Sequence, residues 1–93
     1  MKPIKVNYID YDGKRTSTTI SPQISLFWGR YHGYMPSDDM IEYQRQIRQA
    51  IQTYINQFKQ GLNKDIIEGY LLSDLERKII EQYEYNNRQL RLL

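Results

Sequence analysis

The chain is 93 residues long, carries a net charge of +2 and contains no cysteine. This length indicates one domain with a small core. The lack of cysteine excludes a disulfide framework, a zinc site with thiolate ligands and thiol catalysis. The mean hydropathy is −0.75, which indicates few apolar residues for a core. Because association buries additional apolar surface, we expect a homodimer. No segment has the apolar length of a signal peptide or a membrane span, so we expect a cytoplasmic protein without membrane contact.

The N-terminal residues have the pattern of a β-hairpin. Residues 4–11 alternate and are rich in β-formers, which predicts a strand. Asp12-Gly13 favours a two-residue turn, after which residues 14–20 form the returning strand. This turn sets Ile9 opposite Thr16, so neither face of the hairpin is cleanly apolar. One face is expected to carry Ile4, Val6, Tyr8, Arg15, Ser17 and Thr19.

Two helices are predicted in the middle of the chain. Ser21 is a suitable N-cap and Pro22 a suitable first residue for a short helix that runs to about Tyr31. Ser37 is predicted to cap a longer helix that ends at Gly61. Along this longer helix, apolar residues at spacings of about three and four form a seam for packing, either within the core or across a dimer. The seam residues are Met40, Ile47, Ile51, Tyr54 and Phe58.

The C-terminal third is also predicted to be helical, in two pieces. Residues 63–72 have the pattern of a short helical turn, which Gly69 weakens. Ser73 and Glu76 match a capping box, which predicts that the last helix starts there.

We therefore predict an α+β fold, in which an N-terminal β-hairpin is followed by about three helices, in a dimer. The expected organisation of the single domain 1–93 is a hairpin or ribbon (1–21), a helix-loop-helix (22–60) and a C-terminal helical segment (61–93).

Catalytic and metal-binding patterns are weak in this sequence. His32 is the only histidine and stands beside Gly33, so we interpret it as a loop or helix-end residue. Asp38, Asp39 and Glu42 form the one tight acidic cluster, which suits helix capping and solvation better than metal binding. We expect no enzymatic activity, no cofactor and no metal.

Binding to duplex DNA has the better chemical support. A two-stranded ribbon fits the major groove and presents alternate side chains to base edges. Arg15 suits a forked contact with guanine, and Ser17 and Thr19 suit contacts with several bases. The cations expected to contact phosphates are Lys5, Lys14 and Arg30.

Residues 14–56 also resemble a known family. The run Lys14 to Pro22, a short helix, a loop through Gly33 to Ser37 and a second helix through Ile55 resemble a ribbon-helix-helix module. The resemblance implies a dimeric transcriptional regulator, antitoxin or plasmid-transfer accessory protein, in which each protomer gives one strand to an intermolecular ribbon. It implies base contacts for Arg15, Ser17 and Thr19, and places Ser37 where amides at the start of the second helix meet a phosphate.

Two other classes of protein stay open. The size, the lean core and the abundance of tyrosine and glutamine suit a small phage- or plasmid-type protein that binds another protein, and inhibits or adapts it, without DNA contact. A structural subunit that assembles through its long helices is the third class.

Overall fold

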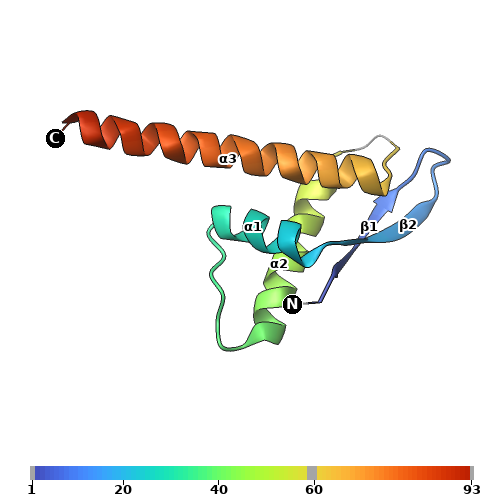
Figure 1. The fold of residues 1–93 in the computed structure, drawn as a ribbon. Coiled ribbons are helices and arrows are strands. Elements are labelled where there is room, and N and C mark those ends of the chain that lie inside the picture. Colours follow the sequence, from blue (N-terminus) through green and yellow to red (C-terminus); the bar gives the residue numbers. More distant parts are fainter. Residues whose placement is uncertain (1, 59–60, 93) are drawn as a thin grey trace.

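The computed structural model describes residues 2–58 and 61–92, the last four of these by their backbone alone. It confirms the α+β arrangement, because an antiparallel two-stranded hairpin precedes three helices (Figure 1). The elements are β1 (Ile4–Ile9), β2 (Arg15–Ile20), α1 (Pro22–Tyr31), α2 (Met40–Ile55) and α3 (Lys64–Leu92). The C-terminal half of α3 projects beyond the other elements (Figure 1), and the longest dimension of the molecule is 54 Å.

The hairpin turn differs from the predicted one by one residue. Asp10 and Lys14 close it, with the Asp10 N–H donating to the Lys14 carbonyl at 2.9 Å. The Asp10 carboxylate also accepts from the backbone N–H groups of Asp12 and Lys14, both at 2.9 Å. Gly13 has a φ of 78°, which suits a three-residue loop that ends in a left-handed residue. The expected two-residue turn is therefore wrong.

This turn also corrects the pairing of the strands. Ile9 lies opposite Arg15, and Tyr8 lies opposite Thr16, instead of Ile9 opposite Thr16. A shift of one residue moves a whole set of side chains to the other face. The predicted grouping of Ile4, Val6 and Tyr8 with Arg15, Ser17 and Thr19 is therefore wrong, and these two sets lie on opposite faces.

The inner face of the hairpin contributes to the hydrophobic core. Ile4, Val6 and Ile20 are buried, whereas their neighbours along each strand are exposed. The buried hydrophobic residues from the other elements are Trp28, Tyr43, Ile47, Ile51, Ile55, Leu62, Ile67, Leu71 and Leu75. One core therefore joins the hairpin to all three helices.

Helix α1 has the bounds that its sequence predicts. The Ser21 hydroxyl accepts a hydrogen bond from the Ile24 N–H at 3.2 Å, and Pro22 occupies the first helical position. Helix α2 begins later than predicted, because its N-cap is Asp39, whose carboxylate accepts from the Glu42 N–H at 3.0 Å. Ser37 is therefore not the cap.

Helix α2 ends at Ile55 and not at Gly61. Its buried side is a row of residues four apart, Tyr43, Ile47, Ile51 and Ile55, so Tyr43 belongs to the packed side although the predicted seam omits it. Of the predicted seam, Ile47 and Ile51 lie in the core of their own chain, Tyr54 and Phe58 pack partly against that core, and Met40 is exposed.

Helix α3 is continuous from Lys64 to Leu92, so the predicted division into a short turn and a last helix is wrong. The Asn63 side chain accepts from the Ile66 N–H at 2.9 Å and caps the helix start in place of Ser73. Ile67, Leu71 and Leu75 are buried at intervals of four residues. This packing stabilises the helical conformation across Gly69 and Ser73. In the described residues, no helix is both long and apolar enough to span a membrane.

Candidate nucleic-acid interface

The outer face of the hairpin is a polar, exposed surface. Each of its six side chains is exposed, and none is a carboxylate. They are Lys5, Asn7 and Ile9 from β1 and Arg15, Ser17 and Thr19 from β2. Arg15, Ser17 and Thr19 thus point to solvent together, which is the arrangement that a base-contacting ribbon requires.

Helix α2 holds the outer edge of β1. The Gln52 side-chain amide accepts from the Asn7 N–H at 2.8 Å and donates to the Asn7 carbonyl at 2.8 Å. The Leu62 N–H donates to the Ile9 carbonyl at 2.9 Å. These bonds occupy the edge positions that a neighbouring strand would otherwise use, so β1 is covered on this side.

The outer edge of β2 is open. Because the backbone groups of Asn7 point away from β2, Asn7 and Ser17 form a non-hydrogen-bonded pair, and the backbone groups of Ser17 point away from β1. Because hydrogen-bonded and non-hydrogen-bonded pairs alternate, the backbone N–H and C=O groups of Arg15 and Thr19 also point away from β1. Among the described residues, no backbone or side-chain group hydrogen-bonds to these outward N–H and C=O groups.

The other predicted phosphate contacts are distributed around the molecule. Lys14 is exposed at the hairpin turn, beside the outer face. Arg30 is exposed in the last turn of α1, at the end of that helix far from the hairpin (Figure 1). Ser37 is exposed in the loop before α2, and its hydroxyl donates to the Asp39 carbonyl at 3.0 Å. The carboxylate of Asp39 caps the helix start where a phosphate was expected. Of the predicted phosphate contacts, Lys5 and Lys14 therefore lie with the hairpin face.

Two basic residues on α2 were absent from the predicted site. Arg48 lines a groove with Lys5 and Asn7 of β1, and it also lines a second hollow with Arg45 and Lys2. The spacing of Arg45, Arg48 and Gln52 places all three on one side of α2, but only the pairing with β1 shows which side this is.

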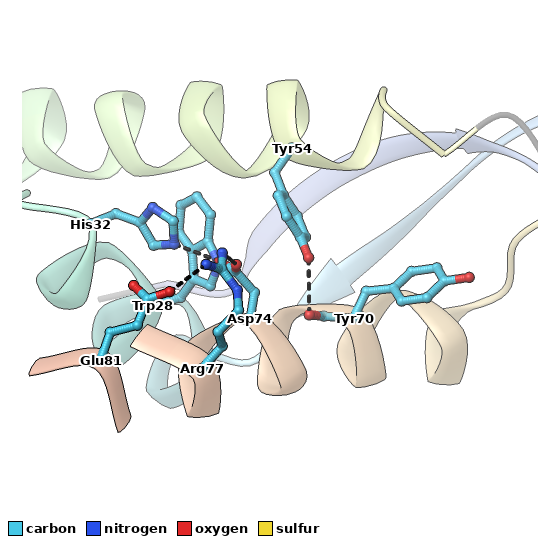
Figure 2. Close-up of polar contacts among 7 residues, drawn as sticks. All are labelled: Trp28, His32, Tyr54, Tyr70, Asp74, Arg77 and Glu81. Atoms are coloured by element: carbon cyan, nitrogen blue, oxygen red, sulfur yellow. Dashed lines mark hydrogen bonds and ion pairs between the residues drawn. The ribbon is translucent and has the colours of Figure 1, made fainter. Parts of the chain in front are cut away.

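A polar cluster around the buried carboxylate of Asp74 joins α1 to α3 (Figure 2). The Trp28 indole N–H donates to the Asp74 carboxylate at 2.9 Å, and the His32 Nε2 lies 2.6 Å from the same oxygen. Arg77 donates to the other Asp74 oxygen at 2.7 Å and to Glu81 at 2.8 Å. Trp28 and His32 also stack, with ring centroids 3.9 Å apart.

This cluster changes the acidity of Asp74. Burial by itself raises the pKa of a carboxyl group, but hydrogen bonds from Arg77, His32 and Trp28 outweigh it and hold the pKa of Asp74 below its ordinary value. Burial raises the pKa of the Tyr54 phenol, with a contribution from the negative charge of Asp74, and this phenol donates to the Tyr70 carbonyl at 3.2 Å. The cluster orients α1 against α3, away from the hairpin face.

In the part of the chain that the structure describes, no three His, Asp or Glu side chains come together as a metal site. No family model matches the chain, and neither the curated proteins nor the solved structures provide a match.

Proposed function

We propose that this is a small, non-enzymatic DNA-binding protein that reads duplex DNA with the outer face of its hairpin. The observation that carries the proposal is that Arg15, Ser17 and Thr19 are exposed together on a face without a carboxylate. Such a face meets the negative potential of DNA without repulsion and still offers donors and acceptors to base edges.

The dimensions of the hairpin support this proposal. Two paired strands lie about 4.8 Å apart, and a B-DNA major groove is about 12 Å wide, so it admits a two-stranded ribbon. Both strands of this ribbon belong to one chain, because β2 pairs with β1 along its length. A ribbon shared between protomers, which the resemblance implies, is therefore not needed to form the reading surface.

The residues have distinct roles in this proposal. Arg15 donates two parallel hydrogen bonds to guanine, the commonest specific contact in the major groove. Ser17 and Thr19 contact neighbouring bases. Lys5 and Lys14, on the same face and at the turn, contact phosphates. A regulator or an accessory factor of a mobile element, acting in the cytoplasm, is the setting that we propose for this activity.

For the homodimer, we propose the projecting part of α3 as the interface. Ile79, Ile80 and Tyr83 are about half exposed or more, at 42%, 49% and 66%. At 100° per residue, these three side chains lie on one side of the helix. Glu76 lies at the N-terminal end of this side, whereas the other charged residues lie away from its centre, and they are Arg77, Lys78, Glu81, Glu84 and Arg88. A mainly apolar side can pair with its own copy.

A duplex-binding assay tests the proposed function. We expect the wild-type protein to bind a duplex at about 50 mM salt and to lose affinity steeply towards about 200 mM. Arg15→Ala should weaken binding by about 5- to 150-fold, which corresponds to about 1–3 kcal/mol for a forked base contact. Arg88→Ala is the matched control, because it removes the same charge from exposed helix α3. If the wild-type protein ignores duplex at low salt, or if both variants bind alike, the proposal is wrong.

The open edge of β2 favours a second candidate function, binding to a strand of another protein. Exposed edges pair readily with added strands. An added strand would widen the ribbon, so the two functions compete for the hairpin. Ser17→Pro removes an outward N–H and is expected to abolish strand addition, whereas Ser17→Ala keeps that N–H and is expected to retain it. A partner pulled down from the host by both variants equally would contradict strand addition.

A further inference from the structure

A groove runs between the outer face of β1 and one side of α2. Lys5 and Asn7 line it from the strand, and Arg48 and Gln49 line it from the helix, around a volume of about 480 Å³. A second hollow of about 710 Å³ shares Arg48 and continues towards the start of α2. The two hollows thus adjoin at Arg48, and together they are called the α2 groove.

Four cations line the α2 groove, beside the exposed apolar side chains of Met40 and Ile41. Lys2, Lys5, Arg45 and Arg48 line it, and no carboxylate does. In the described part of the chain, the carboxylate that bonds to one of these cations is that of Glu42, which accepts from the Arg45 Nε at 2.8 Å. Together these five side chains carry +3, which exceeds the net charge of +2 on the whole chain. The rest of the chain therefore has a net charge of −1.

Arg48 is the cation of the groove that is best placed for an external anion. Its side chain is exposed. Among the described residues, the ion pairs include neither Arg48 nor Lys5. A guanidinium in this position can donate two parallel hydrogen bonds to one phosphate.

We infer that the α2 groove binds the sugar–phosphate backbone of the duplex strand that flanks the hairpin, an inference that rests on the proposed function. Lys5 and Asn7 belong both to the outer face of the hairpin and to the groove. When the hairpin occupies the major groove, whatever lies beside β1 meets the backbone that forms the wall of that groove. Helix α2 lies there, because Gln52 bonds it to the edge of β1.

The two surfaces then have different tasks. Arg15 contributes to the choice of sequence, because it reaches base edges. Arg48 contributes to affinity for any sequence, because phosphates are the same at every step of the duplex. The salt dependence of binding distinguishes these tasks, since each phosphate contact adds about 0.9 to the slope of log affinity against log salt.

The test compares Arg48→Ala, Arg15→Ala and Arg88→Ala on two duplexes of equal length, one rich in A·T pairs and one rich in G·C pairs. For Arg48→Ala we expect weaker binding to both duplexes by the same factor. Its loss of affinity between about 50 and 200 mM salt should be about 3.5-fold smaller than in the wild type, as the loss of one phosphate contact predicts. Arg15→Ala should instead change the ratio of the two affinities, and Arg88→Ala should change neither quantity.

The outcomes separate this inference from the proposed function. If the wild type binds duplex and Arg48→Ala keeps the wild-type salt slope, the groove does not contact phosphate, although the hairpin function stands. If the wild type binds neither duplex at low salt, the proposed function fails and the inference fails with it. Circular dichroism of each variant shows whether it is folded, and Arg48→Gln, which also removes the charge, serves as a second variant.

Discussion

The side-chain amide of Gln52 forms hydrogen bonds with both backbone groups of Asn7, each 2.8 Å long. A glutamine on α2 thus occupies the place of a neighbouring strand at the edge of β1. The same amide donates to Asn56 at 2.9 Å, which fixes its orientation. The hairpin is therefore positioned by the helix next to it, in addition to the apolar packing of its inner face.

Replacing Gln52 by alanine should weaken this attachment. Two hydrogen bonds to the backbone are lost, and because water can replace them at this exposed site, we expect unfolding free energy to fall by about 1–2 kcal/mol. Urea denaturation measures this change, and hydrogen exchange should show faster exchange of the Asn7 amide. Gln49→Ala is the control, since Gln49 lies one turn away on the same groove. Equal stability of the two variants would mean that the amide does not hold β1.

Sequence patterns predicted the elements of this fold better than their ends. Ser21 and Pro22 located α1 correctly, because a cap and a first-turn proline are local signals. The hairpin register was missed because Asp10 accepts two backbone N–H groups and thereby selects a longer loop. The predicted helical break at Ser73 is absent because tertiary burial of Leu71 and Leu75 outweighs a local capping pattern.

Part of the candidate site was predictable, because alternation along a strand is also a local signal. Alternation along a strand places Arg15, Ser17 and Thr19 on one face whatever the register is. Whether Arg48 contributes to the site depends on which side of α2 faces β1. Contacts between residues that are distant in the sequence determine that side. The buried Asp74 cluster likewise joins residues more than forty positions apart, and a single sequence contains no local signal for such a contact.

Gly29 lies where α1 crosses α2 and tests how closely these helices pack. A Cβ at this position would clash with the Cδ1 of Ile47, a side chain that is itself fully buried. We expect Gly29→Ala to reduce the unfolding free energy by about 1–3 kcal/mol, as overpacking does. Adding Ile47→Val, which removes the clashing carbon, should recover part of this loss.

Gly69 provides the matched control for that substitution. It lies within α3, and a Cβ there would meet no atom within 4 Å. Gly69→Ala should therefore stabilise the protein by up to about 1 kcal/mol through helix propensity alone. Thermal unfolding followed by circular dichroism measures both variants, and a shift in the same direction for both would contradict the proposed packing of α1 on α2.

Asp74 should make the protein sensitive to acid. Its folded pKa lies below the ordinary value of 3.8, so on acidification the unfolded chain takes up this proton first. The stabilisation is therefore complete above about pH 5 and is lost as the pH falls from about 3.8 through the lower folded pKa. Asp74→Asn should flatten this part of the stability curve and should lower the unfolding free energy at neutral pH by about 2 kcal/mol.

Glu81→Gln is the control for the acid response, because Glu81 also bonds to Arg77 but is exposed. An exposed ion pair contributes less than about 1 kcal/mol, so we expect nearly wild-type stability from pH 7 to about pH 5. Denaturant unfolding over this range and down to about pH 2 measures the response. An Asp74→Asn protein with the same acid transition as the wild type would show that other carboxyl groups control it.

A charge introduced on each of two apolar surfaces of the protein distinguishes which of them forms a dimer. Ile51 is completely buried in its own chain, whereas Ile79 is 42% exposed on the projecting part of α3. A carboxylate at position 51 would be buried without a partner, so Ile51→Asp should unfold the protein. Ile79→Asp leaves the core intact, and its carboxylate should separate a dimer that pairs through α3 into folded monomers. Light scattering with circular dichroism measures mass and folding together, and a folded Ile79→Asp protein with the wild-type dimer mass would exclude this side of α3 as the interface.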